Sequence, residues 1–263
     1  MSAPSSVWTN PLDPLVQTMT PIEKLGGRVA LDEATPGSPV VGVDLRGTQI
    51  TDADLGHLKG LEQLRELSLQ QTRISDAGLV HLTGLKNLQV LSLGKTQVTD
   101  AGLVHLKGMT GLRHLHLGHT GITDAGLAQL QGLMELQELH LARTEVTDAG
   151  MAHLGTLPKL RVVHLSNNRI TDAGLAALVK SLPNLEELKL GHTLVTNAGM
   201  VHLLGLAKLR ELKLNRSQIT DAGLAPLKKL RQLQMLELAE IDGVTAAGVR
   251  DLQQALPDLK IDR

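Results

Sequence analysis

Three histidines lie within nine residues of this chain, in the stretch LRHLHLGHT from Leu112 to Thr120. Imidazole nitrogens bind transition metals, and near neutral pH an imidazole also serves as a general acid or base. The chain contains no cysteine, so disulfides and thiolate metal sites are excluded. The stretch is therefore a candidate metal site, a candidate catalytic site or a recognition surface. The elements that position His114, His116 and His119 decide among these three.

The composition of the chain limits the classes of partner that it can bind. The formal net charge is −1 at pH 7, so no overall basic field attracts nucleic acid or acidic membranes. Phe and Tyr are absent and Trp8 is the only aromatic residue, although apolar residues make up 42% of the chain. The core must then be aliphatic, and the aromatic platforms that stack nucleic-acid bases are missing. We expect neither nucleic-acid binding nor membrane binding.

Targeting segments are not evident in the sequence. No stretch approaches the roughly 18 unbroken apolar residues of a membrane span. The first residues, MSAPSSVWTNPLDPL, have neither the basic n-region nor the apolar h-region of a signal peptide. The compartment therefore stays unknown, with the cytoplasm favoured as an expectation.

The strongest pattern in the sequence is a repeat of 24 residues. The block ISDAGLVHLTGLKNLQVLSLGKTQ, which begins at Ile74, agrees at every apolar position but one with VTDAGLVHLKGMTGLRHLHLGHTG, which begins at Val98; the exception is Val90, which aligns with His114. About nine such units follow one another, with one step of 25 residues where VKSLPNL adds a residue. A period of this length is typical of solenoids, in which each unit buries its apolar face against its neighbours.

Each unit combines a strand pattern with a helical pattern. The segment LRELSL, from Leu64 to Leu69, alternates apolar and polar positions with the period of two that indicates a β-strand. The segment TDAGLVHLKGM spaces its apolar residues three apart, which predicts a short helix or a tight helical turn. Thr99 or Asp100 is well placed as the N-cap of this helix, because each offers an acceptor to free N–H groups.

Two further columns of the repeat predict local contacts. A glycine recurs in the first helical turn of eight units, where it costs about 1 kcal/mol relative to alanine. We expect a close approach between neighbouring turns that leaves no room for a Cβ. A threonine recurs where the chain leaves the strand, and its hydroxyl can bond backbone groups left unpaired by the bend. This column reads Thr48, Thr72, Thr96, Thr120, Thr144, Asn168, Thr193 and Ser217.

These units resemble the leucine-rich repeat family, whose pattern LxxLxLxxNxL is matched by LEQLRELSLQQTRI with Thr in place of Asn. The T-D-A-G-L segment is similar to bacterial repeats of this kind. It is also similar to the cysteine-containing subclass found beside F-box domains, although Thr fills the Cys/Asn position here. The resemblance covers residues 40 to 261. It implies an α/β fold, a right-handed horseshoe solenoid with a parallel sheet on the concave face and short helices on the convex face.

The two ends of the array depart from the repeat. We expect residues 1–13 to form a disordered leader. Residues 14–39 read as an N-terminal cap, with a short helix within residues 15–27 closed by Gly26, and then a hairpin strand that pairs with the first repeat. Residues 40–263 are then the leucine-rich repeat domain of about nine repeats, which ends in the charged half-strand LKIDR.

In such a solenoid, alternate strand residues face the concave side, and like positions stack about 4.8 Å apart. This places His116, His140 and His164 next to one another in the middle of the array. The predicted partner-binding residues of the concave face are His114, His116, Glu138, His140, His164, Glu187, Lys189, Glu211 and Lys213. The predicted rim residues are His119, Arg143, His192 and Arg216.

The histidine column permits a metal site without requiring one. His116, His140 and His164 are the candidate ligands, because imidazoles on adjacent strands can share a zinc ion with Glu138 or His114 as a third ligand. Repeats also copy surface residues that have no ligand, and Lys189 beside His164 would repel a cation. From the sequence we therefore assign no metal and no other cofactor. A partner nucleophile is not evident either, so we expect no enzyme.

The sequence favours a non-enzymatic scaffold that recognises a protein or peptide with its polar, histidine-rich concave face. Large apolar anchors are missing from this face, so recognition must rest on polar complementarity. The alternatives are a metal- or pH-responsive histidine surface, and a purely structural repeat module of a larger protein. The charged C-terminal strand favours a monomer.

Overall fold

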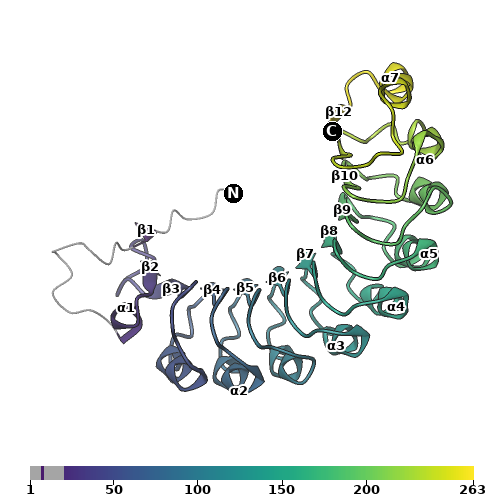
Figure 1. The fold of residues 1–263 in the computed structure, drawn as a ribbon. Helices are drawn as coiled ribbons and strands as arrows, with labels where there is room; N and C mark the ends of the chain where they lie inside the picture. Colours follow the sequence, from purple (N-terminus) through teal and green to yellow (C-terminus); the bar gives the residue numbers. More distant parts are fainter. Residues whose placement is uncertain (1–6, 9–20) are drawn as a thin grey trace.

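The computed structural model describes residues 7–8 and 21–263. The chain forms an arc, with the strands along its inner side and the helices along its outer side (Figure 1). This is the leucine-rich repeat solenoid that the repeat predicts. The predicted leader, residues 1–13, and the beginning of the predicted helix at residue 15 lie outside the described residues, apart from Val7–Trp8, which form a short strand. The division of the chain at residues 13 and 39 stays a prediction.

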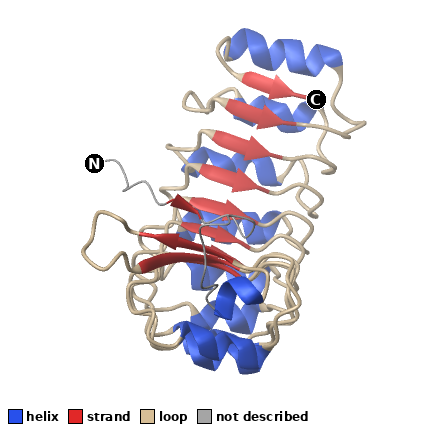
Figure 2. Cartoon of the chain, turned by 90° about the vertical axis from the view of Figure 1, so that its left-hand side faces the viewer, coloured by secondary structure: helices blue, strands red, loops and turns tan. Residues whose placement is uncertain are grey.

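Within the described residues, twelve strands form one sheet in the order of the chain. The first two pairings are antiparallel, and every later pairing is parallel. Figure 2 shows the parallel strands side by side with the helices behind them. The strands are β1 (Val7–Trp8), β2 (Arg28–Leu31), β3 (Val40–Asp44), β4 (Glu66–Ser68), β5 (Val90–Ser92), β6 (His114–His116), β7 (Glu138–His140), β8 (Val162–His164), β9 (Glu187–Lys189), β10 (Glu211–Lys213), β11 (Met235–Glu237) and β12 (Lys260–Asp262).

The helical half of each unit is short and varies between an α-helix and a 3-10 helix. The described α-helices are α1 (Pro21–Lys24), α2 (Asp76–Leu79), α3 (Asp124–Gln129), α4 (Met151–Leu154), α5 (Asp172–Ser181), α6 (Asp221–Leu227) and α7 (Ala246–Ala255). The 3-10 helices are η1 (Asp52–Leu58), η2 (Val80–Leu82), η3 (Gly102–Leu106), η4 (Asp148–Gly150) and η5 (Gly199–Gly205). Among the described residues, no helix has the length and hydropathy to cross a membrane.

An aliphatic core fills the space between the sheet and the helices. Leu115 in β6 and Leu117 just after it are fully buried, and so is Leu106 of η3. Burial of such a side chain contributes about 1.5–3 kcal/mol. Because the same positions recur in every unit, stability accumulates from contacts between neighbouring units and not from one central core.

An aspartate–threonine ladder joins successive helical segments. Oδ1 of Asp100 accepts the backbone N–H of Thr123 at 2.9 Å, and Oδ2 accepts the Thr123 hydroxyl at 2.6 Å. The Thr123 hydroxyl oxygen in turn accepts the N–H of Ala125 and caps α3. Threonine is thus the helix cap, while the aspartate supports the next unit. The equivalent pairs are Asp52–Ser75, Asp76–Thr99, Asp124–Thr147, Asp148–Thr171, Asp172–Thr196, Asn197–Thr220 and Asp221–Thr245.

The repeated glycine has the cause that the sequence predicts. A Cβ on Gly126 would stand 2.1 Å from Oδ1 of Asp100, and one on Gly102 would stand 2.4 Å from Oδ1 of Asp76. These separations are far below van der Waals contact. The carboxylate of one unit therefore occupies the place of a side chain in the next.

The threonine column also has its predicted role. The hydroxyls of Thr72, Thr96 and Thr193 donate to the carbonyl oxygen three residues earlier, at 2.6 to 2.7 Å. Asn168 satisfies two carbonyls at this position, those of Leu141 at 2.7 Å and Leu165 at 3.0 Å. These contacts pair backbone oxygens that the turn out of the strand removes from the sheet.

The described part of the N-terminal region contains a helix and a hairpin. The helix α1 ends at Lys24, and Gly26 follows it with a φ of +84°. The strand β2 then pairs antiparallel with β3, the first strand of the repeat array. At the other end, β12 pairs in parallel with β11.

Candidate functional site

The strands from β6 to β10 position the candidate residues. In each of these strands the middle residue is buried in the core, and the first and third residues are half-buried on the concave face. The register aligns like positions, so His116 pairs with His140 and His140 pairs with His164. The structure therefore brings the predicted histidine column together.

These three histidines form a stack of rings, here called the histidine stack (His116, His140 and His164). The ring centroids of His116 and His140 are 4.0 Å apart, with an angle of 1° between the rings. Those of His140 and His164 are 3.7 Å apart, with an angle of 23°. Stacking covers much of each ring: 34% of the side chain is exposed in His116, 24% in His140 and 12% in His164. The rings are thus less exposed than the sequence predicted for residues facing solvent.

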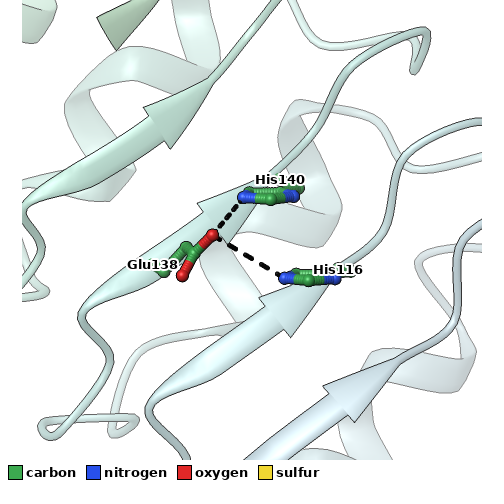
Figure 3. Close-up of side chains that lie close together, drawn as sticks. All are labelled: His116, Glu138 and His140. Atoms are coloured by element: carbon green, nitrogen blue, oxygen red, sulfur yellow. Dashed lines mark ion pairs between the residues drawn. The ribbon is translucent and has the colours of Figure 1, made fainter. Parts of the chain in front are cut away.

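Glu138 lies beside the stack and contacts three histidines. The Nδ1–H of His114 donates to Oε2 of Glu138 at 2.7 Å. Oε1 of Glu138 lies 2.5 Å from Nε2 of His140 and 3.8 Å from Nε2 of His116 (Figure 3). Both Nε2 atoms are buried, and neither contact has the alignment of a hydrogen bond, but the His140 ring is close enough to pair with the carboxylate and to help lower its pKa. His114 therefore fixes one oxygen of the Glu138 carboxylate, Oε2, while the other oxygen, Oε1, faces the rings of His140 and His116.

Burial and neighbouring charges set the pKa values of this cluster. Burial, together with the neighbouring His140, lowers the pKa of His116 to about 4. Burial also lowers the pKa of His164 to about 4, with His140 and Lys189 acting in the same direction. The contact with His114 holds the pKa of the Glu138 carboxyl well below its usual range. At neutral pH the rings of His116 and His164 are therefore uncharged, and each lies beside an ionised carboxylate, that of Glu138 for His116 and that of Glu187 for His164.

The C-terminal half of the concave face carries alternating acidic and basic side chains that pair with one another. Nζ of Lys189 lies 2.8 Å from Oε1 of Glu187, and the same oxygen lies 2.8 Å from Nε2 of His164. Nζ of Lys213 lies 3.1 Å from Oε1 of Glu211 and also contacts Glu237 of β11. The predicted Glu187, Lys189, Glu211 and Lys213 thus form a paired network.

The rim residues lie at a left-handed turn that the sequence did not reveal. His119, Arg143, His192 and Arg216 all have φ between +56° and +59°. Each N–H still continues the parallel ladder: that of His119, for example, donates to the carbonyl of Ala142 at 2.8 Å. His119, Arg143, His192 and Arg216 are exposed at this edge of the face.

A column of basic residues that was not expected from the sequence lies at the opposite edge of the strands. Arg65, Arg113, Arg161 and Arg210 each come directly before a strand. Arg65 lies 3.6 Å from Asp32, and Arg161 lies 3.6 Å from Glu186. The signal was present in the repeat, because these residues recur at one position in the second, fourth, sixth and eighth units, with Gln or Glu between them.

Fold and surface together define an open solenoid with a polar, curved inner face. The leucine-rich repeat region family matches residues 42–199, and a leucine rich repeat matches residues 205–228. The first match covers more than half of the chain, so the chain belongs to the leucine-rich repeat family.

Solved structures support this assignment. The crystal structure of an internalin C2 from Listeria monocytogenes is 26% identical, with a TM-score of 0.61, over 76% of this chain and 81% of that chain. An internalin (inlF) from the same organism is 19% identical, with a TM-score of 0.58, over 84% of this chain and 79% of that chain. No curated protein sequence matches this chain. In general terms the chain is a non-enzymatic scaffold for protein interaction.

Proposed function

We propose that the concave face binds a protein or peptide partner through polar contacts centred on β6 to β10. The observation that supports this most is the half-burial of every first and third residue in these strands. Such side chains are fixed by their neighbours but still accessible, which is the state that lets a partner bind without ordering long flexible chains. The strands that carry them lie along the inner side of the arc (Figure 1).

The distribution of charge supports a partner of mixed charge. The strand columns carry an acidic excess, with Asp44, Glu66, Glu138, Glu187, Glu211 and Glu237 against Lys189 and Lys213. The two edges carry basic residues, namely Arg65, Arg113, Arg161 and Arg210 on one side and Lys95, Arg143 and Arg216 on the other. A segment with basic groups over the strands and acidic groups over the edges would complement this face.

The composition adds one requirement to the partner. The chain has no Phe or Tyr, so the concave columns cannot supply the aromatic anchors that often dominate binding energy. The partner therefore supplies any such anchor, or the interface is polar throughout. We also propose a monomer, because the exposed charged side chains of Lys260 and Asp262 in β12 disfavour pairing of this strand with the edge of another sheet; sedimentation of the purified chain would test it.

The test compares two variants in a quantitative interaction screen. The concave variant carries alanine at His116, His140, Lys189 and Lys213. The convex control carries alanine at four exposed residues of the helical half, Val80, Val104, Val201 and His202. We expect partners of the wild-type chain to be lost by the concave variant and kept by the convex control. Partners kept at full affinity by the concave variant would contradict the proposal. If the wild-type chain binds no partner in the screen, the result would favour a purely structural repeat module.

A further inference from the structure

The two buried nitrogens beside Glu138 are unusual for a plain polar surface. Nε2 of His116 and Nε2 of His140 are both buried and form no well-aligned hydrogen bond, and they lie 3.8 Å and 2.5 Å from the same oxygen of Glu138. A buried polar atom without a well-aligned hydrogen bond costs free energy, so such atoms are rare in folded proteins. Here two of them converge on one carboxylate, in the middle of the concave face (Figure 3).

A metal ion would satisfy all three atoms at once. The ligand atoms of His116, Glu138 and His140 lie within 4.8 Å of one another, the one such group of three among residues 7–8 and 21–263. In a tetrahedral zinc site with bonds of about 2.0–2.2 Å, ligand atoms lie about 3.3–3.6 Å apart. The contacts of 2.5 Å and 3.8 Å around Oε1 lie on either side of that value. Two imidazoles and one carboxylate are also a ligand set that zinc takes in proteins, with water in the remaining position.

Further contacts orient two of the three ligands. Nδ1 of His116 lies 3.3 Å from the hydroxyl oxygen of Ser92, and a hydrogen on Nδ1 leaves Nε2 free to bind a metal. The hydrogen bond from His114 to Oε2 fixes the Glu138 carboxylate and leaves Oε1 toward the two rings. Groups that orient metal ligands in this way are part of a metal site, and their loss usually weakens binding.

His164, the third candidate metal ligand expected from the sequence, contacts a different carboxylate. Nε2 of His164 contacts Oε1 of Glu187 at 2.8 Å, and that oxygen also pairs with Lys189. The charge of Lys189 is thus balanced within its own strand. Lys189 is therefore a weaker obstacle to a cation than the sequence indicated.

We infer that His116, Glu138 and His140 form a site for a divalent transition-metal ion of the zinc type, with His114 as a positioning residue. A bound ion would lie in the plane of each imidazole that binds it, whereas the rings of His116 and His140 are parallel, with an angle of 1° between them. Binding therefore requires the rings to tilt toward each other and to open their stack. This inference does not depend on a protein partner, so it and the proposed recognition function can fail separately.

The test is a calorimetric titration of the chelator-treated chain with zinc chloride at neutral pH. We expect binding of one ion per chain at micromolar zinc. Each of His116→Gln, Glu138→Gln and His140→Gln should weaken binding by about tenfold or more, and His114→Gln should weaken it less. His119→Gln is a matched control that should leave the affinity unchanged. Urea unfolding of every variant shows whether it remains folded.

Nuclear magnetic resonance of the imidazole nitrogens gives a second measurement on the unmodified chain. Zinc should shift the Nε2 resonances of two histidines, assigned through the variants to His116 and His140. The absence of heat at 100 µM zinc would overturn the inference, as would binding that survives His140→Gln but not His119→Gln. Shifts confined to histidines outside this group of three would also overturn it.

Discussion

Gly126 lies so close to Asp100, one repeat earlier, that a Cβ on this glycine would stand 2.1 Å from Oδ1 of the aspartate. The same carboxylate accepts two hydrogen bonds from Thr123, at 2.9 Å and 2.6 Å. The aspartate therefore sets both the spacing and the orientation of the next helical segment. The residues of the repeated T-D-A-G sequence therefore join one unit to the next, and the contribution of each residue can be tested separately.

The close contact at Gly126 predicts that Gly126→Ala lowers the free energy of unfolding by about 1–3 kcal/mol, because the added methyl displaces the carboxylate. Helix propensity alone would favour alanine by about 1 kcal/mol, so the sign of the change discriminates between the two effects. Urea unfolding measures it. Gly84→Ala is the control, because a Cβ there meets nothing within 4 Å and φ is not positive. A stabilised Gly126→Ala chain would contradict the close packing.

The aspartate itself should contribute through its two acceptor oxygens. We expect Asp100→Ala to lower the free energy of unfolding by about 1–3 kcal/mol, because Thr123 loses the partners of its N–H and hydroxyl. Asp100→Asn should have a smaller effect. At the equivalent position, Oδ1 of Asn197 accepts the N–H of Thr220 at 2.8 Å and its Nδ2 donates to the Thr220 hydroxyl at 2.9 Å. Equal losses for the alanine and asparagine variants, measured by urea unfolding, would mean that charge and not hydrogen bonding is decisive.

The fold could be predicted from the sequence because its determinants are repeated. Leu115, Leu139 and their equivalents recur at fixed spacing, so the pattern of one strand is checked by all the others. The glycine and threonine columns were read correctly for the same reason. The exchange of α-helix and 3-10 helix was not predictable, since the segments of η3 and α3 share the sequence DAGL and yet form helices of different type.

The histidine stack predicts acid sensitivity of the metal-free chain. The folded-state pKa of His116 and of His164 is lowered from 6.5 to about 4. Below pH 6.5 the unfolded chain therefore binds protons at two positions where the folded chain stays neutral, and stability falls until the pH reaches about 4. The slope has an upper limit of about 1.4 kcal/mol per pH unit for each histidine. Urea unfolding in chelator at several pH values measures it.

Carboxylates act in a lower pH range and can be separated from this effect. The pKa of Glu138 and that of Glu187 are lowered from the usual 4.5, so their stabilisation is present above that pH and is lost only below it. Between pH 6.5 and 4.5 the histidines should dominate. A His116→Gln, His164→Gln double variant should therefore flatten the profile in this range. A double variant of the exposed convex histidines His57 and His202 should keep the wild-type slope.

The site was predictable only in part. Alternation within each strand places His114, His116 and Glu138 on one face, and the repeat aligns them with their neighbours. Side-chain rotation then decides the contacts: His164 turns to Glu187 while His140 turns to Glu138. These choices depend on the neighbours of each ring within a few ångströms, so spacing in the sequence does not reveal them. The left-handed rim turn was also hidden, because Lys95, His119 and Arg143 are not residues that signal it.

That rim turn leads to a prediction about which side chains the edge of the face tolerates. Arg143 has a φ of +56°, a conformation that branched side chains adopt poorly and that asparagine adopts more easily, as Asn167 does one repeat later. Arg143→Val should lower the free energy of unfolding by about 1–2 kcal/mol, whereas Arg143→Asn should leave it unchanged or raise it. Arg161, at the opposite edge, has no positive φ, so Arg161→Val should change the free energy of unfolding by no more than about 0.5 kcal/mol. Urea unfolding of the three variants compares them directly.

Equal tolerance of valine at both edges would mean that the backbone at the rim turn relaxes to accept the branched side chain. If valine destabilises the chain at residue 143 but not at residue 161, the rim positions require side chains that accept a left-handed backbone. Their charge can still differ from repeat to repeat, so partner specificity can vary at the rim without loss of the fold.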